Sequence, residues 1–223
     1  MNEIICIITL LLSFTFVILS YKFFGKFGLF LWISISTIIA NIEAVKLIEI
    51  FGIETSLGTV LYGSTFLATD ILNLKYGEKE TRKTIIIGFL SMIMISIFMF
   101  FCISYIPSSS DFAQDSLKTI FSVNVRITLG SIIAFMISQF LDTIIFQKLH
   151  KKYNKLWLSN NVSTMICQIV DTIIFCTITY YGLISNKSLI EIMLSMYIFK
   201  FIIALLDTPF IYIADKLKNI REY

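Results

Sequence analysis

Four aspartates stand in parts of the sequence that are otherwise almost wholly apolar. Asp70, Asp142, Asp171 and Asp207 each lie inside a hydrophobic run long enough to cross a lipid bilayer. A carboxylate at membrane depth costs about 2.5–3.5 kcal/mol on insertion scales, so these side chains must face the interior of a helical bundle, with polar partners, water or a bound proton. Carboxylates gathered in this way could bind a polar ligand through its hydrogen-bond donors.

Other polar residues accompany these aspartates at helical spacing. Asn161, Thr164, Gln168 and Asp171 follow one another at intervals of three or four residues, which places them on one face of a helix. Four further runs carry such a face: Ser34, Thr37 and Asn41; Thr59, Gly63, Phe66, Asp70 and Asn73; Ser131, Phe135, Ser138, Gln139 and Asp142; Tyr197, Lys200, Ala204 and Asp207. These faces predict that polar side chains from several helices converge.

A short repeat strengthens this interpretation. The segment 139–146, QFLDTIIF, is echoed by 168–175, QIVDTIIF, and 206–210, LDTPF, repeats part of it. The pattern Q-x-x-D places an amide and a carboxylate on one helical face, and adjacent antiparallel helices could turn two such elements toward one cavity. Hydrogen bonding that only holds the helices together is the alternative. The number of polar groups at compatible depths favours a ligand pocket.

We therefore predict that nine polar side chains bind the substrate: Asn41, Asp70, Gln139, Asp142, Asn161, Gln168, Asp171, Lys200 and Asp207. The two Q-x-x-D elements would form the recognition shell, and Lys200 would pair with Asp171 or Asp207 while the site is empty. One of the aspartates could also carry a coupling proton.

The elements that must position these residues are membrane-spanning helices. The chain has 223 residues, of which 57% are hydrophobic and 15% charged, and its mean hydropathy is +0.86. A soluble fold could not bury so much apolar surface. We predict an all-α, polytopic helical bundle of about six to seven spans in one domain, residues 1–223. The candidate spans are 4–20, 29–50, 56–74, 84–106, 123–147, 161–184 and 189–213.

Lysine and arginine gather in alternate connections. The basic segments are 21–28, 75–83, 148–160 and the tail after residue 213, and the intervening connections carry few basic residues. By the positive-inside rule, this alternation places the N-terminus outside and the C-terminus in the cytoplasm of a bacterial cell membrane.

This orientation fixes the depth of the aspartates. Asp70, Asp142 and Asp207 lie near the cytoplasmic ends of their helices, roughly 6–9 Å deep at 1.5 Å per residue, and Asp171 lies near the midplane. We predict that the four carboxyl groups share one wet cavity in the inner half of the bilayer.

Several classes of function lack support in the sequence. The four cysteines lie in apolar runs without a C-x-x-C pair, and the single histidine, His150, stands among lysines, so we expect neither a metal site nor a cofactor. No G-x-x-x-x-G-K-[ST], H-E-x-x-H or serine motif with a nearby histidine occurs, which argues against ATP hydrolysis and against an enzyme. The net charge of +3 does not indicate nucleic-acid binding.

Five segments carry a resemblance to a known family. Residues 65–77 (TFLATDILNLKYG), 135–146 (FMISQFLDTIIF), 156–164 (LWLSNNVST), 168–172 (QIVDT) and 200–210 (KFIIALLDTPF) resemble, in the same order and spacing, the queuosine precursor transporter family of vitamin-uptake-type carriers. The resemblance implies import of a 7-deazaguanine compound: 7-cyano-7-deazaguanine, 7-aminomethyl-7-deazaguanine or queuine. A homodimer is one assembly that the sequence allows.

Two positions depart from the pattern of that family. Leu74 stands where an acidic residue is frequent, and Ser159 stands where a basic residue is common. These departures bear on the choice of precursor more than on the class of function.

The residues suit such a substrate. A guanine-like edge presents a ring N–H beside an exocyclic amine, which one carboxylate can accept together. A flat base also stacks on aromatic rings, for which Phe66, Phe135, Tyr197 and Phe201 are candidates.

Two other hypotheses remain at this point. The chain could be a substrate-binding membrane subunit that needs a separate energising module, which uptake by the protein alone would exclude. It could instead be a membrane enzyme acting on lipids, which would require a nucleophile with its base, or a metal cluster, at one depth.

Overall fold

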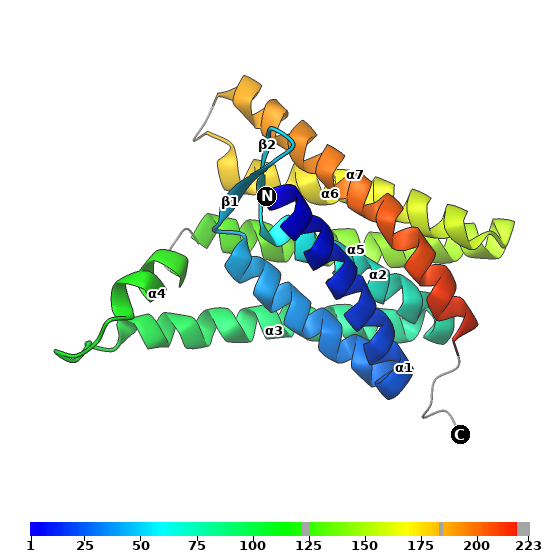
Figure 1. Cartoon of the computed structure of the whole chain (residues 1–223), viewed down its shortest axis with the longest axis horizontal. Helices are drawn as coiled ribbons and strands as arrows, with labels where there is room; N and C mark the ends of the chain where they lie inside the picture. The colour runs from blue at the N-terminus through cyan, green and yellow to red at the C-terminus, as the bar shows by residue number, and fades with distance from the viewer. Residues whose placement is uncertain (122–124, 183–184, 218–223) are drawn as a thin grey trace.

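Seven helices and one short hairpin make up the chain. The computed structural model describes residues 1–121, 125–182 and 185–217 (Figure 1). The elements are α1 (Asn2–Glu43), β1 (Leu47–Ile50), β2 (Ile53–Ser56), α2 (Gly58–Tyr76), α3 (Glu78–Ser104), α4 (Gln114–Phe121), α5 (Val125–Tyr153), α6 (Leu156–Tyr180) and α7 (Asn186–Lys216). The predicted all-α class is confirmed. Residues 123–124 and 183–184 of the predicted spans, and the tail from 218, lie outside the described residues.

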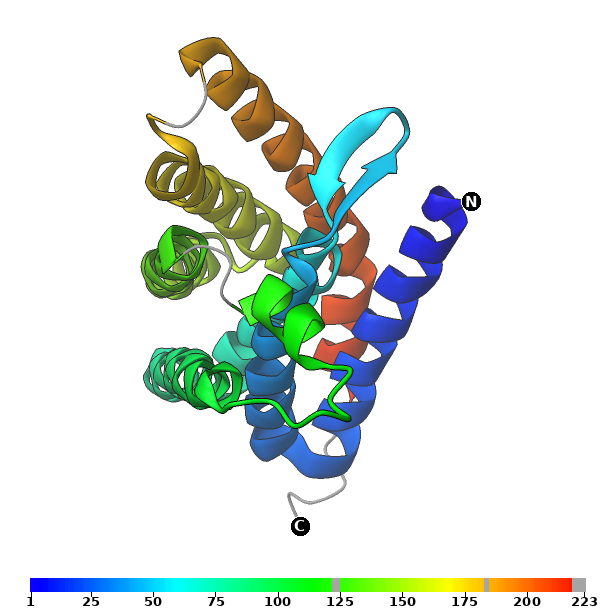
Figure 2. The same ribbon diagram turned by 90° about the vertical axis from the view of Figure 1, so that its left-hand side faces the viewer.

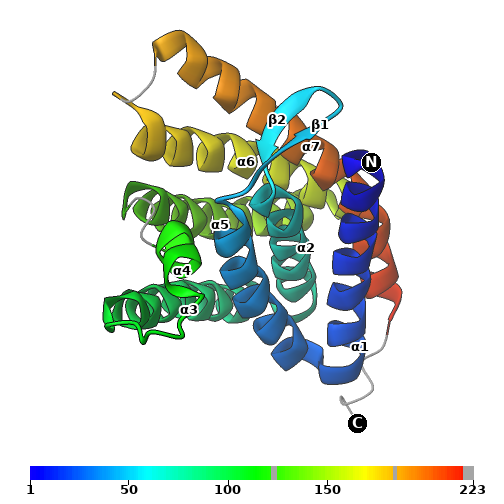
Figure 3. The same ribbon diagram turned by 60° about the vertical axis from the view of Figure 1, so that its left-hand side comes forward.

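The first two predicted spans are the two limbs of α1. Gly25 interrupts the helix with φ 58° and ψ −136°, a conformation that glycine adopts without the steric penalty of a side chain. Three residues later, a Cβ on Gly28 would lie 2.1 Å from the backbone oxygen of Ser20, so a side chain there would prevent the tight reversal. The chain therefore turns back on itself and the limbs run in opposite directions (Figure 3).

The second predicted span was wrong beyond residue 43. Residues 47–50 and 53–56 pair as antiparallel strands, with Ile50 opposite Ile53. The two turn residues, Phe51 and Gly52, have φ of 52° and 75°, as a type I′ turn requires. The apolar residues of this segment thus continue as a hairpin, which lies between α7 and the N-terminal limb of α1 (Figure 2).

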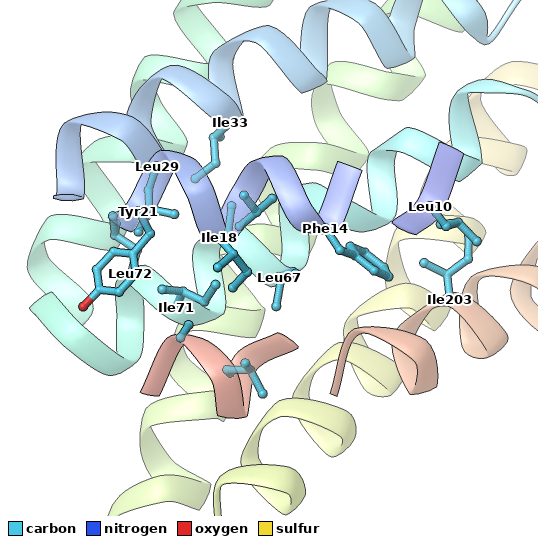
Figure 4. Close-up of a cluster of buried hydrophobic side chains, with 14 of the residues drawn as sticks. Leu10, Phe14, Ile18, Tyr21, Leu29, Ile33, Leu67, Ile71, Leu72 and Ile203 are labelled. Carbon is cyan, nitrogen blue, oxygen red and sulfur yellow. The ribbon is translucent and has the colours of Figure 1, made fainter. Parts of the chain in front are cut away.

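The helices surround a central α2. Figure 2 looks almost along α3, α5 and α6, which form a row, while α7 and the first limb of α1 lie across from them. From Gly58 to Asn73, most side chains of α2 are buried. Apolar side chains of both limbs of α1 pack on Leu67, Ile71 and Leu72 (Figure 4), so the core lies between α1 and α2.

The outer surfaces of the helices are apolar. Five helices in the described ranges are long and apolar enough to cross a membrane, and α1 holds two limbs. Residues exposed along α3 illustrate this surface: Ile86, Leu90, Met94, Ile97, Phe98 and Phe101. Lipid can solvate such a surface and water cannot.

The basic connections meet at one end of the bundle, as their alternation predicted. We call the end with residues 22–26, 75–83 and 148–157 the basic end, and the opposite one, with the strands, the hairpin end. An ion pair of 3.4 Å between Lys26 and Glu80 joins two of these connections. The N-terminus lies at the hairpin end and α7 finishes at the basic end (Figure 1). Which end faces the cytoplasm stays a prediction.

Candidate functional site

A cleft lies in the hairpin half of the bundle. It has an empty volume of about 540 Å³, including the space at its open mouth. The cleft lies among α1, α2, α3, α5, α6 and α7, and its walls include polar, aromatic and charged side chains: Asn41, Thr59, Tyr62, Phe135, Asp171 and Lys200.

A buried ion pair lies in the wall of this cleft. Lys200 Nζ of α7 lies 2.5 Å from Asp171 Oδ2 of α6, and the two side chains are only 5% and 6% exposed. Tyr62 and Ser138 each donate a hydrogen bond of 3.1 Å to the other carboxylate oxygen, Oδ1. Lys200 also donates to Thr172 at 3.3 Å. We call Tyr62, Ser138, Asp171 and Lys200 the Asp171–Lys200 cluster.

The positive charge of Lys200 compensates the negative charge of Asp171 in this cluster. Each oxygen of Asp171 has a donor, and the ammonium of Lys200 also lies 5.8 Å from the centre of the Tyr62 ring. Because Lys200 compensates the carboxylate, the pair can stay charged at membrane depth. The sequence left the partner of Lys200 open between Asp171 and Asp207; the structure pairs it with Asp171.

The other three aspartates form a separate group nearer the basic end. Asp70, Asp142 and Asp207 are 0%, 1% and 1% exposed and come from α2, α5 and α7. Asp70 accepts a 3.3 Å hydrogen bond from Thr164, and Asp207 accepts one of 2.8 Å from Asn160. We call Asp70, Asp142 and Asp207 the carboxyl cluster.

The remaining predicted residues divide between these regions. Asn41 lines the cleft, and Gln168 lines a tighter cavity beside it. Asn161 donates to Trp157 O at 2.9 Å and to Thr208 Oγ1 at 2.7 Å, away from the cleft. Gln139 is fully buried, and its amide has no hydrogen-bond partner among the described residues.

The prediction that the four carboxyl groups share one cavity was wrong. Asp171 faces the cleft, whereas Asp70 and Asp142 line neither cavity, and Asp207 lines only the tighter one. The cause is the antiparallel packing of α5 on α6: a hydrogen bond joins Asp171 to Ser138 on the hairpin side, while Asp142 lies against Cys167 on the basic side. The two Q-x-x-D elements are therefore offset along the helix axis and do not form one shell.

Three residues that belong to these clusters or donate to them were not among the predicted site residues. Tyr62 and Ser138 donate to Asp171, and Asn160, rather than its neighbour Asn161, meets Asp207. Tyr62 lies three residues after Thr59, and Ser138 had been placed on the polar face of its run, so helical spacing offered a signal. The choice between two adjacent asparagines depends on the rotation of α6, which spacing alone did not determine.

The predicted stacking residues differ in their surroundings. Phe135 lines the cleft, with its ring 6.3 Å from that of Tyr62. Phe66 is fully buried against Tyr62 at 5.6 Å, and Tyr197 and Phe201 pair with one another at 6.2 Å. Phe135, Tyr62 and also Phe175, which lines the same cleft, are thus aromatic rings that a ligand would meet.

Comparison with known proteins identifies the family. Residues 56–214, well over half of the chain, match the model of a family described as "Putative vitamin uptake transporter". The chain belongs to this family. Its family and its apolar helices agree in making it a multi-pass membrane protein. The matched range contains every residue of the two clusters, and only the first part of the cleft wall, with Asn41, precedes it.

Two curated relatives of the chain share one name. The chain is 38% identical over 210 residues to the "Probable queuosine precursor transporter" of Bacillus subtilis (strain 168), which covers 93% of the chain and 92% of that relative. A protein of that name from Haemophilus influenzae (strain ATCC 51907 / DSM 11121 / KW20 / Rd) is 27% identical over 132 residues, 59% of the chain and 54% of that relative. The resemblance found in the sequence is confirmed. No solved structure matches the chain significantly.

Proposed function

We propose that this protein imports a queuosine precursor into the cytoplasm, namely 7-cyano-7-deazaguanine, 7-aminomethyl-7-deazaguanine or queuine. The observation that carries the proposal is the Asp171 carboxylate in the wall of an open cleft that also presents aromatic rings and an amide. The names of the relatives support the same class of substrate.

The cleft offers a complement to each edge of a 7-deazaguanine base. Its ring N–H and exocyclic amine lie side by side and can replace two of the donors that Asp171 now accepts. Lys200 stays beside the carboxylate during this exchange, so no charge is left uncompensated. The flat rings can stack on Tyr62 or Phe135, and the amide of Asn41 can donate to the carbonyl of the base.

The direction of transport follows from the proposed orientation. If the basic end faces the cytoplasm, the cleft opens toward the outside. On the basic side, α2 and α5 are held together by hydrogen bonds of 3.1 Å from Asn73 to Thr143 O and of 2.6 Å from Gln147 to Asn73. This state would receive the base from outside, and separation of these helices would release it inward.

Uptake by cells that cannot synthesise the base tests this function. The assay measures queuosine in tRNA after feeding each precursor to cells that express only this transporter. We expect Asp171→Asn to raise the concentration needed for half-maximal uptake by about 10- to 100-fold, because a hydrogen bond to a charged group contributes roughly 1.5–3 kcal/mol. Gln168→Ala, at the edge of the tighter cavity, should also lower uptake.

The matched control is Asp215→Asn, which neutralises an aspartate whose side chain is 48% exposed at the basic end. It should leave uptake unchanged. Full uptake by Asp171→Asn and Gln168→Ala at normal expression would refute the assignment of the pocket. Uptake by the protein alone in a heterologous cell would separate a carrier from a subunit that needs an energising module.

A further inference from the structure

The carboxyl cluster has no cation to balance it. No lysine, arginine or histidine forms an ion pair with Asp70, Asp142 or Asp207 in the described ranges, and the buried Lys200 is already paired with Asp171. Three carboxyl groups, each at most 1% exposed, therefore lie together in the interior of a membrane protein. They cannot all be ionised there, because burial and mutual repulsion both disfavour the charged form.

Two of these groups are placed to share a proton. Asp70 and Asp142 lie where α2 meets α5: Asn73, three residues after Asp70, donates a 3.1 Å hydrogen bond to the backbone oxygen of Thr143, the residue after Asp142. The two carboxyl groups interact with one another there. One oxygen of each, Oδ1, has no hydrogen-bond partner among the described residues. Two carboxyl groups can form a hydrogen bond only when one of them carries a proton, since an ionised carboxylate is an acceptor alone. A proton on this pair supplies the missing donor.

The surroundings of the pair are polar or acidic side chains of α6 and α7. Ser163 and Cys167 of α6 lie against Asp142, and the acidic Asp207 of α7 interacts with both carboxyl groups. Among the described residues, no charged side chain of α1 or α3 forms an ion pair with either group. The pair thus joins α2 to α5 while α6 and α7 cover it, and separation of these four helices would expose it.

A tight cavity lies between the substrate cleft and residues that neighbour this pair. It is lined by Thr59, Tyr62 and Lys200, which also line the cleft, and by Thr164 and Asp207, which belong to the surroundings of the pair. It is too narrow for a water molecule in this conformation, so a proton would cross it only as the helices move. The two sites are therefore adjacent and distinct.

We propose that the Asp70–Asp142 pair binds the proton that drives transport, so that a proton enters the cell with each molecule of base. This inference rests on the proposed function. The protonated pair holds the basic half closed while the base binds at Asp171. When that half opens to the cytoplasm, the proton leaves with the base, and the empty protein must bind a new proton from outside before it can transport again.

Purified protein in liposomes tests the coupling with labelled 7-cyano-7-deazaguanine, which is uncharged. When the outside is one pH unit more acidic, one proton per base sustains an about tenfold accumulation, since both correspond to about 1.4 kcal/mol. A protonophore should abolish this accumulation. Addition of base without a pH gradient should acidify the interior, as followed with a trapped pH-sensitive dye.

The variant Asp142→Asn changes the proposed proton site and leaves the substrate cleft unchanged. Its amide keeps the shape of the carboxyl group and donates to Asp70, as the protonated form does. We expect this variant to exchange labelled for unlabelled base across the membrane while its accumulation ratio falls to about one, and Asp215→Asn to behave as wild type. Accumulation by Asp142→Asn equal to wild type, or wild-type uptake that neither acidifies the interior nor responds to the protonophore, would overturn the proposal.

The dye measurement uses the wild-type protein, so it decides the question even if the variant does not fold. Failure of the wild type to exchange any 7-deazaguanine would instead refute the proposed function, and with it this inference. Exchange without proton movement would leave the proposed function intact and remove the coupling.

Discussion

Replacement of Lys200 by methionine removes the cation that pairs with Asp171 while keeping a long apolar side chain on α7. The two side chains are 5% and 6% exposed, so water cannot replace the lost partner without a change in packing. A carboxylate stranded at membrane depth costs about 2.5–3.5 kcal/mol, and breaking a buried ion pair costs about 3–5 kcal/mol. We therefore expect Lys200→Met to lower the free energy of unfolding by about 3 kcal/mol.

A second substitution should restore most of this loss. In the double variant Asp171→Asn with Lys200→Met, neither partner is charged, and the amide oxygen of the asparagine still accepts from Tyr62 or Ser138. Because removal of a whole buried pair is often close to neutral, the double variant should unfold within about 1 kcal/mol of wild type. Reversible unfolding of the purified protein in mixed micelles measures all three variants at one pH.

The same series separates stability from transport. Both Lys200→Met and the double variant should fail to take up the base, since each changes the donors and acceptors of the cleft. If the double variant were as unstable as Lys200→Met, the loss would come from packing rather than from an uncompensated charge, and the electrostatic account of this pair would be refuted. Normal uptake by the double variant would contradict the role of Asp171 in binding.

Two further predictions concern the packing and the orientation of the bundle. A Cβ on Gly63 would lie 2.3 Å from Cγ2 of the buried Ile203, so Gly63→Ala should lower the free energy of unfolding by about 1–3 kcal/mol. A second substitution, Ile203→Ala, should restore part of this loss. If Gly63→Ala lost no stability in the same micelle assay, the close approach of α2 to α7 would be contradicted. The orientation can be tested in a variant whose exposed Cys102 is replaced by serine. A membrane-impermeant thiol reagent applied to whole cells should label Ser109→Cys at the hairpin end and should not label Lys151→Cys at the basic end. The reverse pattern of labelling would invert the proposed orientation.

Helical spacing and charge predicted much of this protein from its sequence. Seven apolar runs correspond to helical segments, and the polar faces of α2, α5, α6 and α7 all turn inward, because a polar side chain in lipid has no partner. The limits of the runs were less well predicted. At Phe51 and Gly52 a two-residue turn ends the apolar run in a hairpin, a local backbone conformation that hydrophobicity does not encode.

The grouping of the polar residues depended on the packing of the helices. Spacing along one helix gives the face on which Asp171 or Asp142 lies, but the axial offset between two helices depends on how their side chains interlock. That offset pairs Asp171 with Ser138 and separates it from Asp142, which meets Asp70 instead.

The sequence by itself determined that the chain crosses a membrane several times, that its basic connections meet at one end, and that its buried carboxyl groups face inward, because the cost of polar groups in lipid acts on each helix separately. Only the tertiary structure decided that Lys200 balances Asp171 in an open cleft while Asp70 and Asp142 lie together without a cation. The physical reason is that the charge of a buried group is compensated by whichever neighbours lie within a few ångströms, and those neighbours come from other helices.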